Sequence, residues 1–357
     1  MSIRVLIVDD SALVRKVLSD ILKDAAGIEV MGTAQDPIFA QSKMESDWPD
    51  VVLLDVEMPR MDGITFLKKI MRERPTPVVM CSTLTEAGSK TSVQALSIGA
   101  IDVVAKPKAD LKTSLPEASH DLIAAIRVAA KANMAGAKPK PITPLRATEK
   151  KLTADAMLSK TAGRARPGTK TWPLVAIGAS TGGTQALEAV LTALPAHTLP
   201  ILIVQHMPEA FTGAFADRLN KLCKVQVKEA QDNDALLPGR VLIAPGGKHM
   251  MLQATQFGAS VQVKDGPLVS RHKPSVDVLF RSVSKYGSDK VLGIIMTGMG
   301  DDGAKGMKEM HDAGVKTIAQ DQATCVVYGM PQVAVQLGGV DLQAPLRRIP
   351  ELIMAHK

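Results

Sequence analysis

Short apolar runs that end at polar residues recur along the chain and alternate with segments of helical periodicity. In the first third of the chain, the runs that fit buried strands are 3–8, 51–54, 78–81 and 101–105. The segments with helical spacing are 12–22, 38–44, 65–71, 91–98 and 121–130. Strands that are apolar throughout are typical of a parallel sheet with helices on both faces. The sequence therefore predicts a doubly wound α/β domain over residues 1–125.

A second alternation of the same kind begins at Trp172. The expected strands are 172–178, 200–206, 291–296 and 315–320, with a β-rich stretch at 225–263. The expected helices are one that ends near 194 and those at 210–222, 275–286 and 304–313. We therefore predict a second doubly wound parallel-sheet domain over residues 172–357.

The stretch between the two domains, residues 126–171, is predicted to be a basic, flexible linker. It is rich in Lys, Pro, Ala and Thr, so it can bury too little apolar surface to offset the entropy of ordering it. Ten basic and two acidic residues lie between Lys131 and Thr171. Their net charge of +8 exceeds the net charge of +7 of the whole chain. The charge thus belongs to a tether, which could attract an acidic partner, and it argues against a nucleic-acid-binding face.

The rest of the composition bounds the location of the protein. No apolar run approaches the roughly 18–20 residues that cross a bilayer, and the N-terminus does not read as a signal peptide. Cys81, Cys223 and Cys325 show neither a metal-binding spacing nor a disulfide framework. We expect a cytoplasmic protein without membrane insertion.

Carboxylates follow two predicted strands of the first domain. Asp9 and Asp10 end one apolar run and Asp55 ends another, so they should meet at the carboxyl edge of the sheet. Three such charges need a cation, and Mg²⁺ suits oxygen ligands and favours phosphoryl transfer to Asp55. Lys106 could neutralise a phosphoryl oxygen, and Ser82 could donate a hydrogen bond to it. The alternative is that the aspartates only cap turns.

These residues resemble the response-regulator receiver family over roughly residues 1–125. The motifs that carry the resemblance are VDDS (8–11), LLDVEMPRMDG (53–63), CST (81–83) and AKP (105–107). The resemblance implies that a histidine kinase phosphorylates Asp55. It also implies a conformational change on the face that carries Ser82 and the last strand.

The second domain contains a candidate nucleophile in GASTGG (178–183), which fits the motif G-x-S-x-G between a strand and a helix. A Gly-rich turn of this kind also binds phosphates, so that alternative stays open. A serine nucleophile needs a base, and His206 ends the next strand on the same edge. His249, in a turn, is its rival.

An orienting carboxylate is the third member that such a base requires. Asp301 and Asp302 follow the strand at 291–296 and its glycines, again at a carboxyl end. The segment TGMGDDG could instead form a solvated turn or a phosphate cradle.

Residues 172–357 resemble the chemotaxis protein-glutamate methylesterases of the CheB family. The motifs are AIGASTGG (176–183), VQHMP (204–208), RVLIAPGGKHM (240–250), KPSVD (273–277) and MTGMGDDGAKGM (296–307). The resemblance implies a cytoplasmic hydrolase that removes methyl esters from glutamates of methyl-accepting chemoreceptors and deamidates glutamines. It implies the kinase of the chemotaxis system as a second partner and no cofactor in the hydrolase domain.

The same resemblance assigns roles to individual residues. It makes Ser180 the nucleophile, His206 the general base and acid, and Asp302, rather than its neighbour, the orienting carboxylate. Thr181 and Met299 match positions that line the site, and backbone N–H groups near Met299 are candidate oxyanion donors.

Two further readings of the sequence predict different properties. A transcriptional response regulator would have a small helical domain with a basic recognition helix in place of the second α/β pattern. A non-catalytic module that binds a phosphorylated ligand would keep its function when Ser180 is replaced. In the hydrolase interpretation, the receiver restricts access to Ser180 until Asp55 is phosphorylated.

Overall fold

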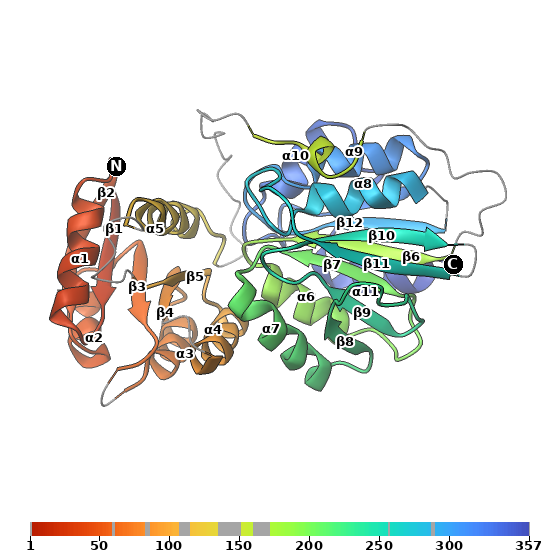
Figure 1. Cartoon of the computed structure of the whole chain (residues 1–357). Helices are drawn as coiled ribbons and strands as arrows, with labels where there is room; N and C mark the ends of the chain where they lie inside the picture. Colours follow the sequence, from red (N-terminus) through yellow and green to blue (C-terminus); the bar gives the residue numbers. More distant parts are fainter. Residues whose placement is uncertain are drawn as a thin grey trace. The chain divides into compact units, whose positions relative to one another are not determined.

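The computed structural model describes eight stretches of the chain. They are residues 2–58, 61–82, 86–106, 115–134, 151–159, 172–255, 258–286 and 290–356. The chain forms two compact units, Met1–Ala137 and Lys138–Lys357 (Figure 1). Each unit is described by itself.

The first unit is a five-stranded parallel sheet with the order β2-β1-β3-β4-β5. Its strands are β1 (Ile3–Val8), β2 (Ile28–Ala34), β3 (Val51–Asp55), β4 (Val78–Ser82) and β5 (Asp102–Ala105). Its helices are α1 (Ala12–Lys23), α2 (Pro37–Ser46), α3 (Gly63–Glu73), α4 (Glu86–Ile98) and α5 (Leu115–Ala129). This strand order is the flavodoxin-like doubly wound fold, so the predicted fold class is confirmed.

Strand β2 was not predicted from the sequence. It lies at the edge of the sheet, and most of its residues are only partly buried. An edge strand lacks the continuous apolar run that marks the central strands, which is why the pattern IEVMGTA gave no signal.

Polar caps fix where the helices of this unit begin. Ser11 and Asp62 accept hydrogen bonds from backbone N–H groups in the first turns of α1 and α3. A Cβ at Gly63 would lie 1.9 Å from the carbonyl oxygen of Asp55. Only glycine therefore lets α3 start this close to the end of β3, where the candidate phosphoacceptor lies.

The second unit is a seven-stranded parallel sheet with the order β14-β13-β12-β6-β7-β9-β8, together with the antiparallel hairpin β10–β11. Its strands are β6 (Leu174–Ala179), β7 (Ile201–Gln205), β8 (Gln226–Glu229), β9 (Arg240–Ile243), β10 (His249–Thr255), β11 (Gly258–Lys264), β12 (Val291–Ile295), β13 (Lys316–Gln320) and β14 (Leu342–Ala344). Its helices are α6 (Gly183–Thr192), α7 (Glu209–Leu222), α8 (Val276–Tyr286), α9 (Ala304–Asp312), α10 (Met330–Gln336) and α11 (Ile349–Ala355), with 3₁₀ turns η1 (Ala154–Ala156) and η2 (Leu346–Arg348).

Helices cover both faces of this sheet, as predicted (Figure 1). Helices α8, α9 and α10 share an apolar core with the strands on one face. Aliphatic side chains and methionines fill most of that core, in keeping with an aromatic content of 3%. Helices α6 and α7 pack on the opposite face, where Phe215 is fully buried.

The strand order reverses between β6 and β12, because β7 lies on one side of β6 and β12 on the other. In an open α/β sheet, such a switch point leaves a crevice at the carboxyl ends of the two strands. Ser180 follows β6 at this crevice, and the loop after β12 contains Met299 and Asp302.

The structure describes two parts of the predicted linker. Helix α5 continues to Ala129, past the expected end of the first domain at residue 125. Residues 151–159 contain η1 and pack on the second unit, because Ala154, Met157 and Leu158 complete an apolar cluster there. The rest of the predicted linker, 135–150 and 160–171, lies outside the described residues. Among the helices that the structure describes, none is long and apolar enough to cross a membrane.

Candidate functional site

Ser180 lies in the sharp turn between β6 and α6. Gly182 has a left-handed φ of 76°, which favours glycine. A Cβ at Gly183 would lie 2.1 Å from Gln205 Oε1, so no side chain fits there. The two glycines therefore allow the strand-to-helix turn that presents a serine at the carboxyl edge of the sheet.

His206 leaves the sheet beside Ser180. Ala179 pairs with Gln205 in the β6–β7 ladder, so Ser180 and His206 are the next residues along two adjacent strands. The His206 side chain is 8% exposed, and its Nε2 lies 2.7 Å from Asp302 Oδ2. The structure thus joins His206 to Asp302 by a hydrogen bond and places Ser180 at the adjacent strand end.

The hydrogen bond to Asp302 determines the tautomer of His206. A carboxylate accepts hydrogen bonds, so Nε2 carries a hydrogen, and in a neutral ring this leaves the lone pair on Nδ1. Nδ1 is buried and has no hydrogen-bond partner among the described residues. In chymotrypsin the aspartate bonds Nδ1 and Nε2 faces the serine, whereas here Asp302 bonds Nε2, which makes Nδ1 the candidate basic atom.

Asp302 is almost fully buried and satisfied by hydrogen bonds. Besides His206, it accepts from Ser275 Oγ at 2.8 Å, Val276 N at 2.7 Å and Asp277 N at 3.0 Å. The two backbone donors belong to the first turn of α8, so a helix N-terminus faces the carboxylate. Burial raises the pKa of Asp302, but the hydrogen bond from His206, the electrostatic influence of His206 and His272, and the hydrogen bond from Asp277 N outweigh it, so the pKa lies below its ordinary value.

The neighbouring carboxylate, Asp301, points elsewhere. Its side chain is 40% exposed and lies 2.6 Å from Lys151 Nζ. Of the two adjacent aspartates, only Asp302 contacts a histidine within the described residues.

His249, the rival base, has a structural position instead. It is fully buried, its Nδ1 accepts from Ser275 N at 3.2 Å, and its Nε2 donates to Pro267 O at 2.9 Å. Burial lowers the pKa of His249 below its ordinary value. Both ring nitrogens are thus hydrogen-bonded to the backbone, and His249 links the segments that contain Pro267 and Ser275.

The sequence reasoning missed His272. Its ring stacks on that of His206, with the ring centroids 3.7 Å apart and the planes 12° apart. Burial, with a contribution from His206, lowers the pKa of His272 to about 3, so the ring is neutral. It directly precedes the motif KPSVD, but no strand end pointed to it.

Two backbone N–H groups close to Ser180 along the chain or in the loop after β12 are candidate donors for an oxyanion. The loop after β12 approaches so closely that a Cβ at Gly298 would lie 2.8 Å from Ser180 Cβ. The N–H groups of Thr181 and Met299 make no hydrogen bond within the described residues. Both are therefore available to a substrate oxygen near the nucleophile.

The first unit gathers its predicted residues at the carboxyl edge of its own sheet. Asp9, Asp10 and Asp55 each offer an oxygen, and these atoms lie within 4.8 Å of one another. Lys106 Nζ lies 2.7 Å from Asp55 and 3.0 Å from Asp9. Ser82 ends β4 and accepts from the backbone N–H of Lys106.

The electrostatics of this cluster fit a cation. Burial, and then the charge of Asp9, raise the pKa of Asp55 to about 6, while Lys106 lowers it. Burial lowers the pKa of Lys106, but Asp55 and Asp9 outweigh it and raise the pKa overall. One lysine does not balance three converging carboxylates, and their oxygens are the ligands that Mg²⁺ prefers.

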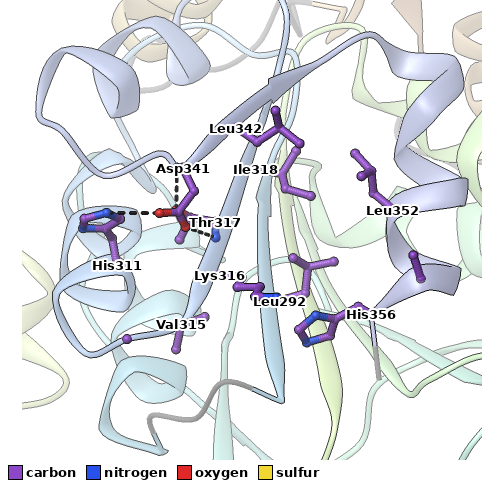
Figure 2. A pocket seen from close by; sticks show the side chains of 12 residues that line it. Leu292, His311, Val315, Lys316, Thr317, Ile318, Asp341, Leu342, Leu352 and His356 are labelled. Atoms are coloured by element: carbon purple, nitrogen blue, oxygen red, sulfur yellow. Dashed lines mark hydrogen bonds and ion pairs between the residues drawn. The ribbon is translucent and has the colours of Figure 1, made fainter.

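A separate hollow of about 530 Å³ lies at the opposite edge of the second sheet (Figure 2). It is lined where β12, β13 and β14 begin and by α11, and the His311–Asp341 pair lies on its rim. None of the residues assigned to the hydrolase site lines it.

Comparisons with known proteins agree with this division. Residues 175–353 match the family described as CheB methylesterase, and residues 5–115 match the response regulator receiver domain. A protein-glutamate methylesterase/protein-glutamine glutaminase 2 of Chromobacterium violaceum is 59% identical over 99% of each chain. A protein-glutamate methylesterase/protein-glutamine glutaminase 1 of Pseudomonas savastanoi is 58% identical, covering 99% of this chain and 98% of the relative.

A solved structure matches the second unit. The CheB methylesterase catalytic domain of Thermotoga maritima is 36% identical, with a TM-score of 0.51, and covers 52% of this chain and 98% of its own. The second unit therefore has a solved α/β counterpart, and it is not the small helical domain that the transcriptional-regulator interpretation predicts.

Proposed function

This chain belongs to the CheB methylesterase family, and we propose that it hydrolyses methyl esters on glutamate side chains of methyl-accepting chemoreceptors. The same site would deamidate glutamine side chains, because both reactions pass through one acyl-enzyme. Full-length relatives carry both activities in their names. The reaction would reset the receptors during chemotactic adaptation.

In the proposed first half-reaction, Ser180 Oγ attacks the side-chain carbonyl carbon while His206 Nδ1 takes the hydroxyl proton. Asp302 stabilises the resulting imidazolium through Nε2. The N–H groups of Thr181 and Met299 would hold the tetrahedral oxyanion, and each such donor contributes about 3–4 kcal/mol in a well-studied protease. His206 then returns the proton to the methoxy oxygen, and methanol leaves.

In the second half-reaction, water replaces the alcohol. His206 Nδ1 takes a proton from water, and the hydroxide attacks the acyl carbon. Collapse of this intermediate breaks the bond to Ser180 Oγ, which regains its proton from His206, and the glutamate carboxylate is released.

The observation that carries this proposal is the buried His206–Asp302 hydrogen bond beside Ser180. The test is Ser180→Ala in the full chain, incubated with receptor membranes that carry radiolabelled methyl groups. We expect the kcat for methanol release to fall by about 10³-fold or more. The matched control is Ser284→Ala, since the hydroxyl of Ser284 donates to Arg281 O in its own helix.

Methanol release that survives in Ser180→Ala would rule out covalent catalysis by this serine. Such a result would favour the binding-module interpretation of the Gly-rich turn. Equal losses in Ser180→Ala and Ser284→Ala would instead indicate a general loss of folded protein, which thermal unfolding of both variants would reveal.

We also propose that a histidine kinase phosphorylates Asp55 and thereby relieves a restraint on the hydrolase. Asp9, Asp10 and Asp55 would hold the Mg²⁺ ion, which would supply positive charge to the phosphoryl group. Lys106 would pair with a phosphoryl oxygen, and Ser82 would donate a hydrogen bond to it.

The test of this control compares the full chain with Asp55→Asn, each with and without a small-molecule phosphodonor. Wild type should release methanol faster with the donor, whereas the variant should not respond. A variant that still responds would exclude Asp55 as the acceptor.

A cytoplasmic location is part of the same proposal. Cys81, Cys223 and Cys325 are free thiols, as expected of a protein in a reducing compartment.

A further inference from the structure

The stacking of His272 on His206 restricts a rotation of the His206 ring that the hydrogen bond to Asp302 still allows. The hydrogen bond at Nε2 holds one atom of the His206 ring, but the ring can still turn about that point. A parallel ring at 3.7 Å, tilted by 12°, fixes the plane as well. Together the two contacts determine where Nδ1, the basic atom, points.

The turn that carries His272 is strained. Val269 N donates to His272 O at 3.0 Å, and His272 N donates to Val269 O at 2.9 Å. The two residues between them, Ser270 and Arg271, have φ angles of 50° and 71°. Residues other than glycine rarely adopt positive φ angles, so other contacts must hold the turn in this conformation.

Residues 151–159, the docked segment, supply several of those contacts. Ser270 N donates to Leu152 O at 2.9 Å. Val269 is fully buried in the apolar cluster that includes Ala154. The turn has a further tie within the second unit, since Ser270 Oγ donates to Asp277 Oδ2 at 3.0 Å.

The docked segment is itself anchored by Arg281, whose side chain is 4% exposed. Arg281 donates to Asp155 Oδ1 at 2.7 Å and to Leu158 O at 3.2 Å. The same guanidinium pairs with Glu309 on α9 through two nitrogens. A buried guanidinium needs this full set of acceptors, which makes the segment part of the folded unit.

We propose that the docked segment is a positioning element of the hydrolase: it holds the Val269–His272 turn, and His272 in turn orients the base His206. The functional catalytic unit thus begins near Lys151, although the family match begins at residue 175. His272 is a positioning residue, since it contacts the base and exchanges no proton. The inference deepens the proposed function and rests on it.

The first experiment compares Ala154→Asp with Ala156→Asp in the full chain. Ala154 is 3% exposed inside the cluster, whereas Ala156 is exposed two residues away. A carboxylate at 154 should undock the segment, speed hydrogen exchange of the Ser270 amide, and lower kcat about 10–100-fold with little change in KM. The same carboxylate at 156 should leave both quantities at their wild-type values.

The second experiment uses His272→Phe and His272→Ala. A phenyl ring preserves the stack without a titratable nitrogen, so His272→Phe should keep most of the kcat, whereas His272→Ala should lose tenfold or more. Equal losses would show that His272 acts through its nitrogens and would overturn the positioning role. Thermal unfolding of each variant separates these effects from loss of the fold.

The outcomes distinguish this inference from the proposed function. Equal hydrogen exchange of the Ser270 amide in Ala154→Asp and Ala156→Asp would overturn the proposal that the segment holds the turn. Faster exchange in Ala154→Asp with an unchanged kcat would overturn the proposal that the turn orients His206. A wild-type chain that releases no methanol would overturn the proposed function, and the exchange measurement would still report on the docked segment.

Discussion

The two sheets of this chain each present carboxylates at the carboxyl edge, but they neutralise them by different means. In the receiver, Asp9 and Asp55 share Lys106, and Asp10 remains exposed. In the hydrolase, Asp302 accepts from His206 and from three donors at the start of α8. The receiver cluster thus has negative charge that Lys106 does not balance, whereas the carboxylate of Asp302 is compensated by its hydrogen-bond donors.

The pKa values follow the donors rather than the burial. Asp55 and Asp302 are both almost completely buried, and burial raises the pKa of each. For Asp55, one lysine does not offset burial and the charge of Asp9, and the pKa rises to about 6. For Asp302, the hydrogen bonds from His206 and Asp277 N and the electrostatic influence of His206 and His272 bring the pKa below its ordinary value. One fold class thus provides one carboxylate suited to binding an ion and another suited to orienting a histidine.

The largest expected effect comes from Asp302→Asn. An amide can donate to His206 Nε2, which would place the ring hydrogen on Nδ1 and remove the base. The corresponding change in a serine protease costs about 10⁴-fold in kcat, and we expect a similar loss of methanol release.

The matched control for that variant is the adjacent Asp301→Asn. Within the described residues its exposed side chain pairs with Lys151 alone, so the kcat of the variant should remain close to that of wild type. Similar losses at both positions would contradict the separation of roles between the two neighbouring carboxylates.

Mg²⁺ binding tests the receiver side of the comparison. Asp10→Asn replaces one of three carboxylates with a neutral amide, so the Mg²⁺ affinity measured by titration calorimetry should fall by about tenfold or more. Asp20→Asn, an exposed aspartate on α1, should bind as wild type does. If Asp302→Asn also changed the number of Mg²⁺ ions bound, Asp302 would take part in ion binding, contrary to what its hydrogen bonds indicate.

The sequence predicted the parts of the molecule that depend on local pattern. Buried strands read as apolar runs, and their polar ends located Asp55, Ser180 and His206 at the correct edges. The choice of Asp302 over Asp301 needed the family resemblance, because adjacent aspartates have the same local pattern. Burial and the N-terminus of α8 distinguish them in the structure.

The features that the sequence did not reveal depend on contacts between distant segments. His272 reaches His206 through a turn with two left-handed residues that are not glycine, which no turn pattern predicts. Ala154, Met157 and Leu158 are too few to mark a docked segment within a basic stretch. Their significance lies in the surface they meet, around Val269.

A smaller effect is expected from Asp277→Asn. Burial and the charge of Asp302 raise the pKa of Asp277 from 3.8 to about 7. Between those values the folded protein keeps a proton that the unfolded chain releases, so this carboxyl contributes less to stability as the pH rises from about 4 to about 7. The variant lacks this titration.

The measurement is the Tm of Asp277→Asn minus that of wild type, followed with pH. This difference should increase from pH 4 to pH 7 and level off above it. Asp217→Asn, an exposed aspartate on α7, should show no such trend. A difference that falls over this range would mean that Asp277 is ionised in the folded protein throughout.

The smallest expected effect separates the lysine–carboxylate pairs of the two regions. Lys106 reaches carboxylates that are at most 2% exposed, whereas Lys151 and Asp301 are 28% and 40% exposed. An exposed pair contributes about 0–1 kcal/mol, so Lys151→Ala should lower the free energy of unfolding by no more than that in a urea titration. The kcat should be nearly unchanged, because Arg281 and the apolar cluster still hold the docked segment. A tenfold loss of kcat in Lys151→Ala would place the main anchor of the segment at Asp301 instead, directly beside the carboxylate that orients the base.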